Sequence, residues 1–169
     1  MNSTIYHLAQ LNISRIVAPL TAPVMADFVA QLDTINAIAD RTPGFVWRLQ
    51  TEAGNATNIQ AFDDPHLLVN LSVWESVEAL QTFVYRGGHG QAMRDRRKWF
   101  ETSDLPSVVL WWIAAGQIPT LPEAQARLNR LRQHGATPEA FTFAKPFAPP
   151  AAETPVYNLY QFFSMTNET

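Results

Sequence analysis

The fold is decided by residues 67–84, which read LLVNLSVWESVEALQTFV. The first eight of them are mostly aliphatic, which predicts a strand in the interior of a sheet. Ser76 then indicates the start of a helix, because its hydroxyl can accept a hydrogen bond from a backbone N–H of the first turn. Apolar residues follow at helical spacing: Val77, Leu80, Phe83 and Val84. The stretch therefore predicts a strand followed directly by a helix with one apolar face.

Further elements are predicted on both sides of this unit. Three more strands are expected where aromatic and β-branched residues are frequent, at 6–16, 45–50 and 107–115. A helix should begin near Pro23 and end before Pro43-Gly44, because proline suits the first helical turn and glycine the end.

The remaining helices follow the third and fourth strands. A second helical piece is expected at 91–100, after a glycine-rich break at 87–90. Thr120 and Glu123 form a capping box for a last helix that should end near Gly135. The order β-α-β-β-α-β with an extra C-terminal helix predicts a ferredoxin-like α+β sandwich.

Composition limits the class of protein. The chain has 169 residues, of which 47% are hydrophobic and 16% charged, which suits one domain at 1–147. Residues 148–169 are interpreted as a proline-rich linker and an aromatic arm. A net charge of -3 argues against nucleic acid as a partner. With no cysteine, no secretory signal and no long apolar run, we expect a cytoplasmic protein that does not contact a membrane.

His89 is the first candidate for a catalytic residue. It lies among three glycines, which let a ligand approach the backbone closely, and imidazole exchanges protons near neutral pH. The alternative is a surface or capping histidine. Metal binding is not expected, because no histidine or carboxylate cluster has the spacing of a ligand set.

Candidate substrate-binding residues are aromatic or basic: Trp74, Tyr85, Arg94, Arg97 and Trp111. Trp74 and Trp111 are expected to form pocket walls, although core packing also explains tryptophans. The arginines are expected to hold a polar substituent, and the alternative is a solvated helix face. Adjacent residues of a strand point to opposite faces, so only one of Trp111 and Trp112 can face such a pocket.

The segment Trp74–Phe83 resembles the strand-to-helix junction of the dimeric α/β-barrel superfamily, which includes antibiotic-biosynthesis monooxygenases and haem-degrading enzymes. The pattern is similar to a largely bacterial family of uncharacterised domains in that superfamily when further positions are included, namely Tyr85, His89, Arg94, 97–100, 109–112 and 138–143. The resemblance implies a homodimer in which two sheets form one barrel, with a cavity between sheet and helices in each subunit. The face of the sheet away from the first two helices would then line a shared interior.

The resemblance also implies a choice of functions. The first is a small-cavity enzyme like the cofactor-independent monooxygenases, acting on a lipophilic, aromatic metabolite and needing no cofactor. In such enzymes an Asn, a Trp and a His assist oxygen chemistry; Trp74 and His89 would supply two, and Asn70 or Asn58 the third. The alternatives are a haem-binding or haem-modifying protein with His89 as axial ligand, and a non-catalytic module that binds a small molecule.

Overall fold

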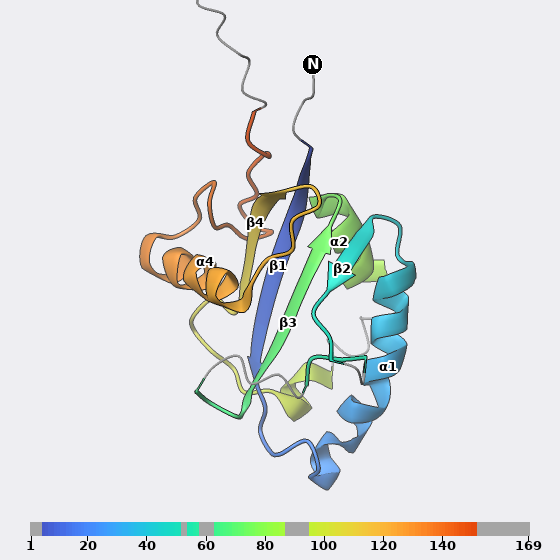
Figure 1. The fold of residues 1–169 in the computed structure, drawn as a ribbon. Helices are drawn as coiled ribbons and strands as arrows, with labels where there is room; N and C mark the ends of the chain where they lie inside the picture. The colour runs from blue at the N-terminus through green and yellow to red at the C-terminus, as the bar shows by residue number, and fades with distance from the viewer. Residues whose placement is uncertain (1–4, 52–53, 58–62, 87–94, 152–169) are drawn as a thin grey trace, which may run out of the picture.

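A four-stranded antiparallel sheet forms the centre of the molecule (Figure 1). The computed structural model describes residues 5–51, 54–57, 63–86 and 95–151. The strands are β1 (Tyr6–Arg15), β2 (Phe45–Arg48), β3 (Leu67–Trp74) and β4 (Val108–Ala114). Their order across the sheet is β2-β3-β1-β4. This confirms the ferredoxin-like α+β arrangement, and β3 has the bounds that the sequence predicts.

Two of the helices begin directly after a residue whose hydroxyl caps them. They are α1 (Ala26–Arg41), which follows the short 3-10 helix η1 (Pro23–Met25), α2 (Val77–Arg86) and α4 (Leu121–His134). The Ser76 hydroxyl accepts a hydrogen bond from the Ala79 N–H at 3.1 Å, as predicted. The Thr120 hydroxyl accepts from the Glu123 N–H at 3.3 Å. The Glu123 carboxylate is used differently from a capping box, because it accepts from Trp111 Nε1 at 3.1 Å.

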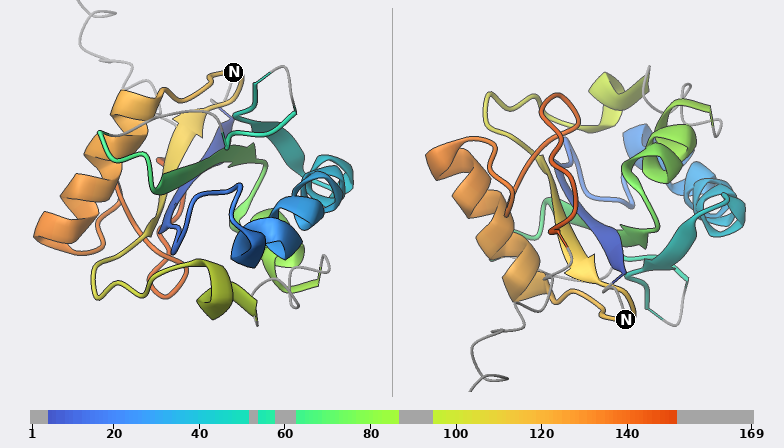
Figure 2. Two further views of the ribbon diagram at one scale, coloured as in Figure 1. Left: turned by 90° about the horizontal axis from the view of Figure 1, so that it is seen from below. Right: turned by 90° about the horizontal axis from the view of Figure 1, so that it is seen from above.

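One face of the sheet is covered by α1 and α2 (Figure 2). Its apolar core includes Leu8, Trp74 and Leu110 from the strands and Leu80 and Phe83 from α2. Segment 136–147 lies beside this core: Phe141 pairs with Leu110 through two backbone hydrogen bonds of 2.8 Å. This pairing protects the free edge of β4 from other strands.

The far face of the sheet is covered by α4 of the same chain (Figure 2). The buried strand side chains of its core are 7% exposed or less: Ala9, Leu11, Ile13, Val69, Leu71, Val73, Val109, Trp111 and Ile113. Ala124, Leu128 and Leu131 of α4 pack on them. The sequence led us to expect an interior shared between two subunits here, whereas the structure fills this position with the extra helix.

Two further predictions concern membrane-spanning helices and the C-terminal segment. No helix within the described residues is long and apolar enough to cross a membrane. The proposed arm at 148–169 lies outside the described residues beyond 151.

Candidate functional site

A cavity of about 180 Å³ lies between α1 and the face of the sheet that α1 covers. Phe28, Leu32 and Ile35 of α1 line it on one side, and Asn12 and Asn70 of the two central strands on the other. Helix and strand residues thus form most of the lining, and the loop residues Asn55, Ala56 and Thr57 complete it.

The sheet side of the cavity is polar. Asn12 lies directly opposite Asn70 in the β1–β3 ladder, so both side chains are on the same face. The Ser14 hydroxyl donates to Asn12 Oδ1 at 3.2 Å, and the Asn12 amide N–H groups have no acceptor among the described residues. Within the described part of the chain, the side-chain amides of Asn36 and Asn70 also have no hydrogen-bond partner. The site therefore offers several unused N–H donors to a bound molecule.

The opposite side of the cavity is aromatic. The Phe28 ring lies 5.7 Å from the Trp99 ring and 5.1 Å from the Phe100 ring, edge to face with the latter. Helical residues 95–99 are held at the end of β1, where Val17 N donates to Trp99 O and Glu101 N donates to Arg15 O, both at 2.9 Å. The three rings, set at an angle to one another, form an apolar wall against which an aromatic ligand can pack.

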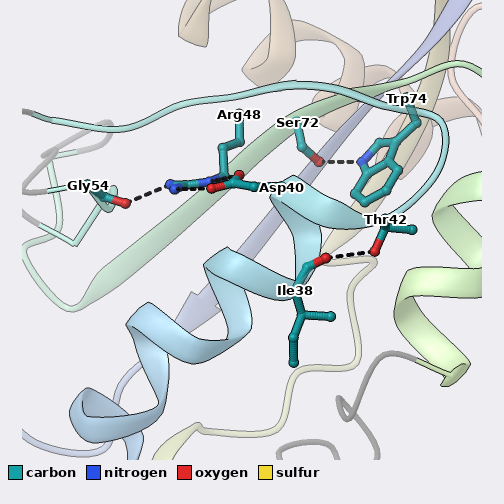
Figure 3. Close-up of polar contacts among 7 residues, drawn as sticks. All are labelled: Ile38, Asp40, Thr42, Arg48, Gly54, Ser72 and Trp74. Atoms are coloured by element: carbon teal, nitrogen blue, oxygen red, sulfur yellow. Dashed lines mark hydrogen bonds and ion pairs between the residues drawn. The ribbon is translucent and has the colours of Figure 1, made fainter.

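Arg48 closes the β2 end of the cavity in a fixed orientation. Its Nε and Nη2 donate to the two carboxylate oxygens of Asp40 at 2.7 and 3.1 Å, and its Nη1 donates to Gly54 O at 2.7 Å (Figure 3). This bidentate pair joins α1 to β2. The neighbouring Trp74 Nε1 donates to Ser72 Oγ at 2.9 Å (Figure 3). That hydroxyl donates in turn to Gln10 Oε1 at 2.8 Å.

A second depression, which we call the arginine groove, adjoins the cavity and shares Ser14, Arg96 and Phe100 with it. It is also lined by Arg97 and Arg132. The Arg96 Nη2 donates to Ser14 Oγ at 3.3 Å, and the guanidinium lies 5.9 Å from the centre of the Phe100 ring.

Charges beside the arginine groove are partly neutralised. Arg15 pairs with Asp64 and, at 3.2 Å, with Glu101. The backbone N–H of His66 lowers the pKa of Asp64, and Arg15 adds to the same shift. Asp95 accepts from Lys98 at 2.8 Å and raises the pKa of that ammonium. Arg15 and Lys98 are thus committed to carboxylates.

The residues predicted for a single pocket are spread over the molecule. Trp74 is 1% exposed and stacks on Phe83 at 5.2 Å in the α2-side core. Trp111 lies on the far face under α4, so the two tryptophans cannot wall the same pocket. Trp112 shares the face of Trp74, and Trp111 and Trp112 therefore point to opposite faces, as the strand geometry predicts.

The other predicted site residues have separate positions. Tyr85 is 70% exposed on α2. Arg97 is exposed and lines the arginine groove. His89, Arg94 and Asn58 lie outside the described residues. Of the residues named from the sequence and described by the structure, only Asn70 lines the cavity.

Apart from Asn70, the sequence analysis missed the polar side of the cavity. Gln10, Asn12 and Ser14 alternate with apolar residues along β1, and Asn70 and Ser72 do so along β3. A polar row at period two on strands that should be central is the signal that predicts a lined cavity. Within the described residues, no group of three or more His, Cys, Asp or Glu side chains could hold a metal ion.

Comparison with known proteins identifies the family of this chain but not its reaction. Among curated proteins the sequence has no match. SnoaB, a cofactor-independent oxygenase from Streptomyces nogalater, is 22% identical with a TM-score of 0.41, over 69% of this chain and 98% of SnoaB. NE2512, a protein of unknown function from Nitrosomonas europaea, is 12% identical with a TM-score of 0.42, over 69% and 98% of the two chains. Likenesses this distant say nothing about the reaction.

The family comparison covers most of the chain. The profile described as "Domain of unknown function (DUF3291)" matches residues 7–157, which include nearly all of the strands and helices described above. The uncharacterised family expected from the sequence pattern is thereby confirmed. The chain belongs to the DUF3291 family.

Proposed function

We propose that the cavity between α1 and the sheet binds a flat, lipophilic aromatic molecule and oxygenates it without a cofactor. The observation that carries this proposal is the contrast between the two walls: Phe28, Trp99 and Phe100 on one side, and the paired Asn12 and Asn70 on the other. An aromatic ring would stack on the first wall, while its oxygen substituents accept hydrogen bonds from the amides.

The lining restricts the chemistry that the cavity can support. Among its described residues there is no carboxylate, imidazole or amine, and the only charged side chains are Arg48 and Arg96. Any proton acceptor for a reaction in the cavity must therefore come from outside these residues. A reaction in which the substrate itself supplies the electrons needs only loss of a proton and stabilisation of the resulting anion.

The overall step balances with molecular oxygen as co-substrate. An activated methylene loses a proton, its carbanion adds oxygen and takes the proton back as a hydroperoxide, and the hydroperoxide eliminates water. One methylene group and one molecule of oxygen thus give one carbonyl group and one molecule of water, so the carbon is oxidised and both oxygen atoms are reduced. The amides of Asn12 and Asn70 would donate to the enolate oxygen that carries the charge, and His89 is the proposed proton acceptor.

Occupation of the cavity is tested by Leu32→Trp, which places an indole into the space beside α1. We expect the affinity for the neutral fluorescent probe N-phenyl-1-naphthylamine to fall about tenfold or more, because the probe and the indole need the same volume. Fluorescence titration measures the loss. Val29→Trp on the exposed side of the same helix is the matched control and should leave affinity unchanged. Equal affinity in both variants would exclude the cavity as the binding site.

The polar wall is tested by Asn70→Leu, which keeps the side-chain volume and removes the N–H donors. We expect oxygen uptake with anthrone, a polycyclic probe with an activated methylene, to slow by about tenfold or more. Binding of N-phenyl-1-naphthylamine should stay within about twofold of the wild type. An oxygen electrode measures uptake, with Asn129→Leu on α4 as control. A rate that does not change would remove Asn70 from the reaction.

The homodimer implied by the resemblance remains a proposal. Because α4 covers the far face of the sheet, a second subunit would contact other surfaces of the chain. Sedimentation velocity gives the mass in solution and tests the dimer directly.

A further inference from the structure

The arginine groove has an excess of positive charge in an acidic protein. The whole chain carries a net charge of -3. Four arginines nevertheless line this depression of about 510 Å³, with Glu101 as the carboxylate among its described lining residues. Glu101 is already paired with Arg15. The net charge of the groove therefore comes from the other three arginines, Arg96, Arg97 and Arg132.

These three guanidinium groups have N–H donors that no described residue accepts from. Within the described residues none of them has a carboxylate partner. Arg132 donates from its Nε to Pro106 O at 2.9 Å, and its terminal N–H groups have no acceptor among the described residues. Arg96 donates one bond to Ser14 Oγ at 3.3 Å. A planar fork with unused N–H groups binds carboxylate or phosphate oxygens in pairs.

Hydroxyl groups complete the polar lining. Thr102, Ser103 and Ser107 line the same groove. Hydroxyls donate to anionic oxygens and add no charge of their own. The groove thus combines cations and neutral donors, the pattern expected of a site for an oxyanion.

The groove and the cavity adjoin each other. Ser14, Arg96 and Phe100 line both, and the Arg96 side chain, which donates to Ser14 Oγ and lies 5.9 Å from the centre of the Phe100 ring, stands at the boundary between them. From this juxtaposition we infer that the ligand is an elongated aromatic anion. Its ring system lies in the cavity, and its carboxylate or phosphate lies in the groove on Arg97 and Arg132. This inference names the substrate class of the proposed function and rests on it.

Two probes that share one aromatic skeleton separate the anionic contribution from the apolar one. N-Phenyl-1-naphthylamine is neutral, and 1-anilinonaphthalene-8-sulfonate adds a sulfonate. In Arg97→Gln and Arg132→Gln we expect the sulfonate probe to bind about five- to tenfold more weakly. The neutral probe should stay within about twofold. Arg130→Gln, on the same helix as Arg132 but outside the groove, is the matched control and should change neither affinity.

Salt and competition extend the test. Raising the salt from about 0.05 to 0.5 M should weaken binding of the sulfonate probe in the wild type and have less effect in Arg97→Gln. Displacement by 1-naphthoate or by 1-naphthyl phosphate shows which oxyanion the groove prefers, and displacement by neither contradicts the inference.

Failure of the inference differs from failure of the proposed function. If the sulfonate probe binds both groove variants as tightly as the wild type, the groove holds no anion, while binding of the neutral probe still supports the cavity. If both probes weaken equally, the arginines act on the shape of the site and the inference is overturned. If Leu32→Trp leaves the neutral probe bound normally, the cavity is not the site and both proposals fail. Arg97 is exposed, so its variant gives a result even where Arg132→Gln unfolds.

Discussion

Replacing Trp111 by alanine is expected to lower the free energy of unfolding by about 3–5 kcal/mol, the largest stability effect that we predict. The indole is fully buried between β4 and α4, so its removal leaves a cavity that the sheet cannot close. The change also removes the N–H that donates to Glu123 at the start of α4. Denaturation by urea, followed by circular dichroism, measures the loss.

Two comparisons make this prediction specific. Trp111→Phe keeps most of the apolar contact and loses the hydrogen bond, so it should cost about 1–2 kcal/mol. Tyr85→Ala truncates an aromatic side chain that is 70% exposed, and should stay within about 0.5 kcal/mol of the wild type. If Trp111→Ala lowered the free energy of unfolding no more than Tyr85→Ala, α4 would not pack on the far face of the sheet as described.

Replacing His89 by alanine is expected to reduce turnover by about 100-fold or more, because a positioned proton acceptor contributes that much to proton abstraction. The expectation comes from the sequence, in which an imidazole lies in a glycine-rich break between α2 and helical residues 95–99. Oxygen uptake with anthrone measures turnover. The midpoint of thermal unfolding should not change, since no core contact is predicted for this residue.

The matched control for this variant is His134→Ala. His134 is exposed in the last turn of α4, so the same truncation there should leave both turnover and stability unaffected. Equal turnover in the two variants would remove His89 from the mechanism. It would leave the cavity and its amides as a binding site whose proton acceptor is another group.

The strands were predictable because their signal is local. In β3, an almost unbroken apolar run is bounded by Asp-Pro and by the Ser76 cap, and both limits depend on residues within the run or next to it. The capping role of Thr120 is local for the same reason. The use of Glu123 is not, because its partner Trp111 is brought to it only when α4 packs on the sheet.

The cavity could not be assembled from the sequence because its residues are distant along the chain. Asn12, Phe28, Arg48, Asn70 and Trp99 come from five segments that meet only through strand pairing and helix packing. Trp74 and Trp111 were chosen as pocket walls because they are large and aromatic. Size and aromatic character do not indicate which face of the sheet a side chain occupies. Trp74 is buried in the core on the α2 side and Trp111 in the core under α4.

Because α4 belongs to the same chain, the far face of the sheet should stay covered when the protein is diluted. The helix follows β4 after a short connection at 115–120, so it is tethered to the surface that it covers. A tethered cover binds at an effective concentration that does not depend on how much protein is present. A sheet covered by a second molecule would instead become uncovered as the concentration falls. By covering the far face itself, this chain keeps its hydrophobic core closed even when only a few copies are present.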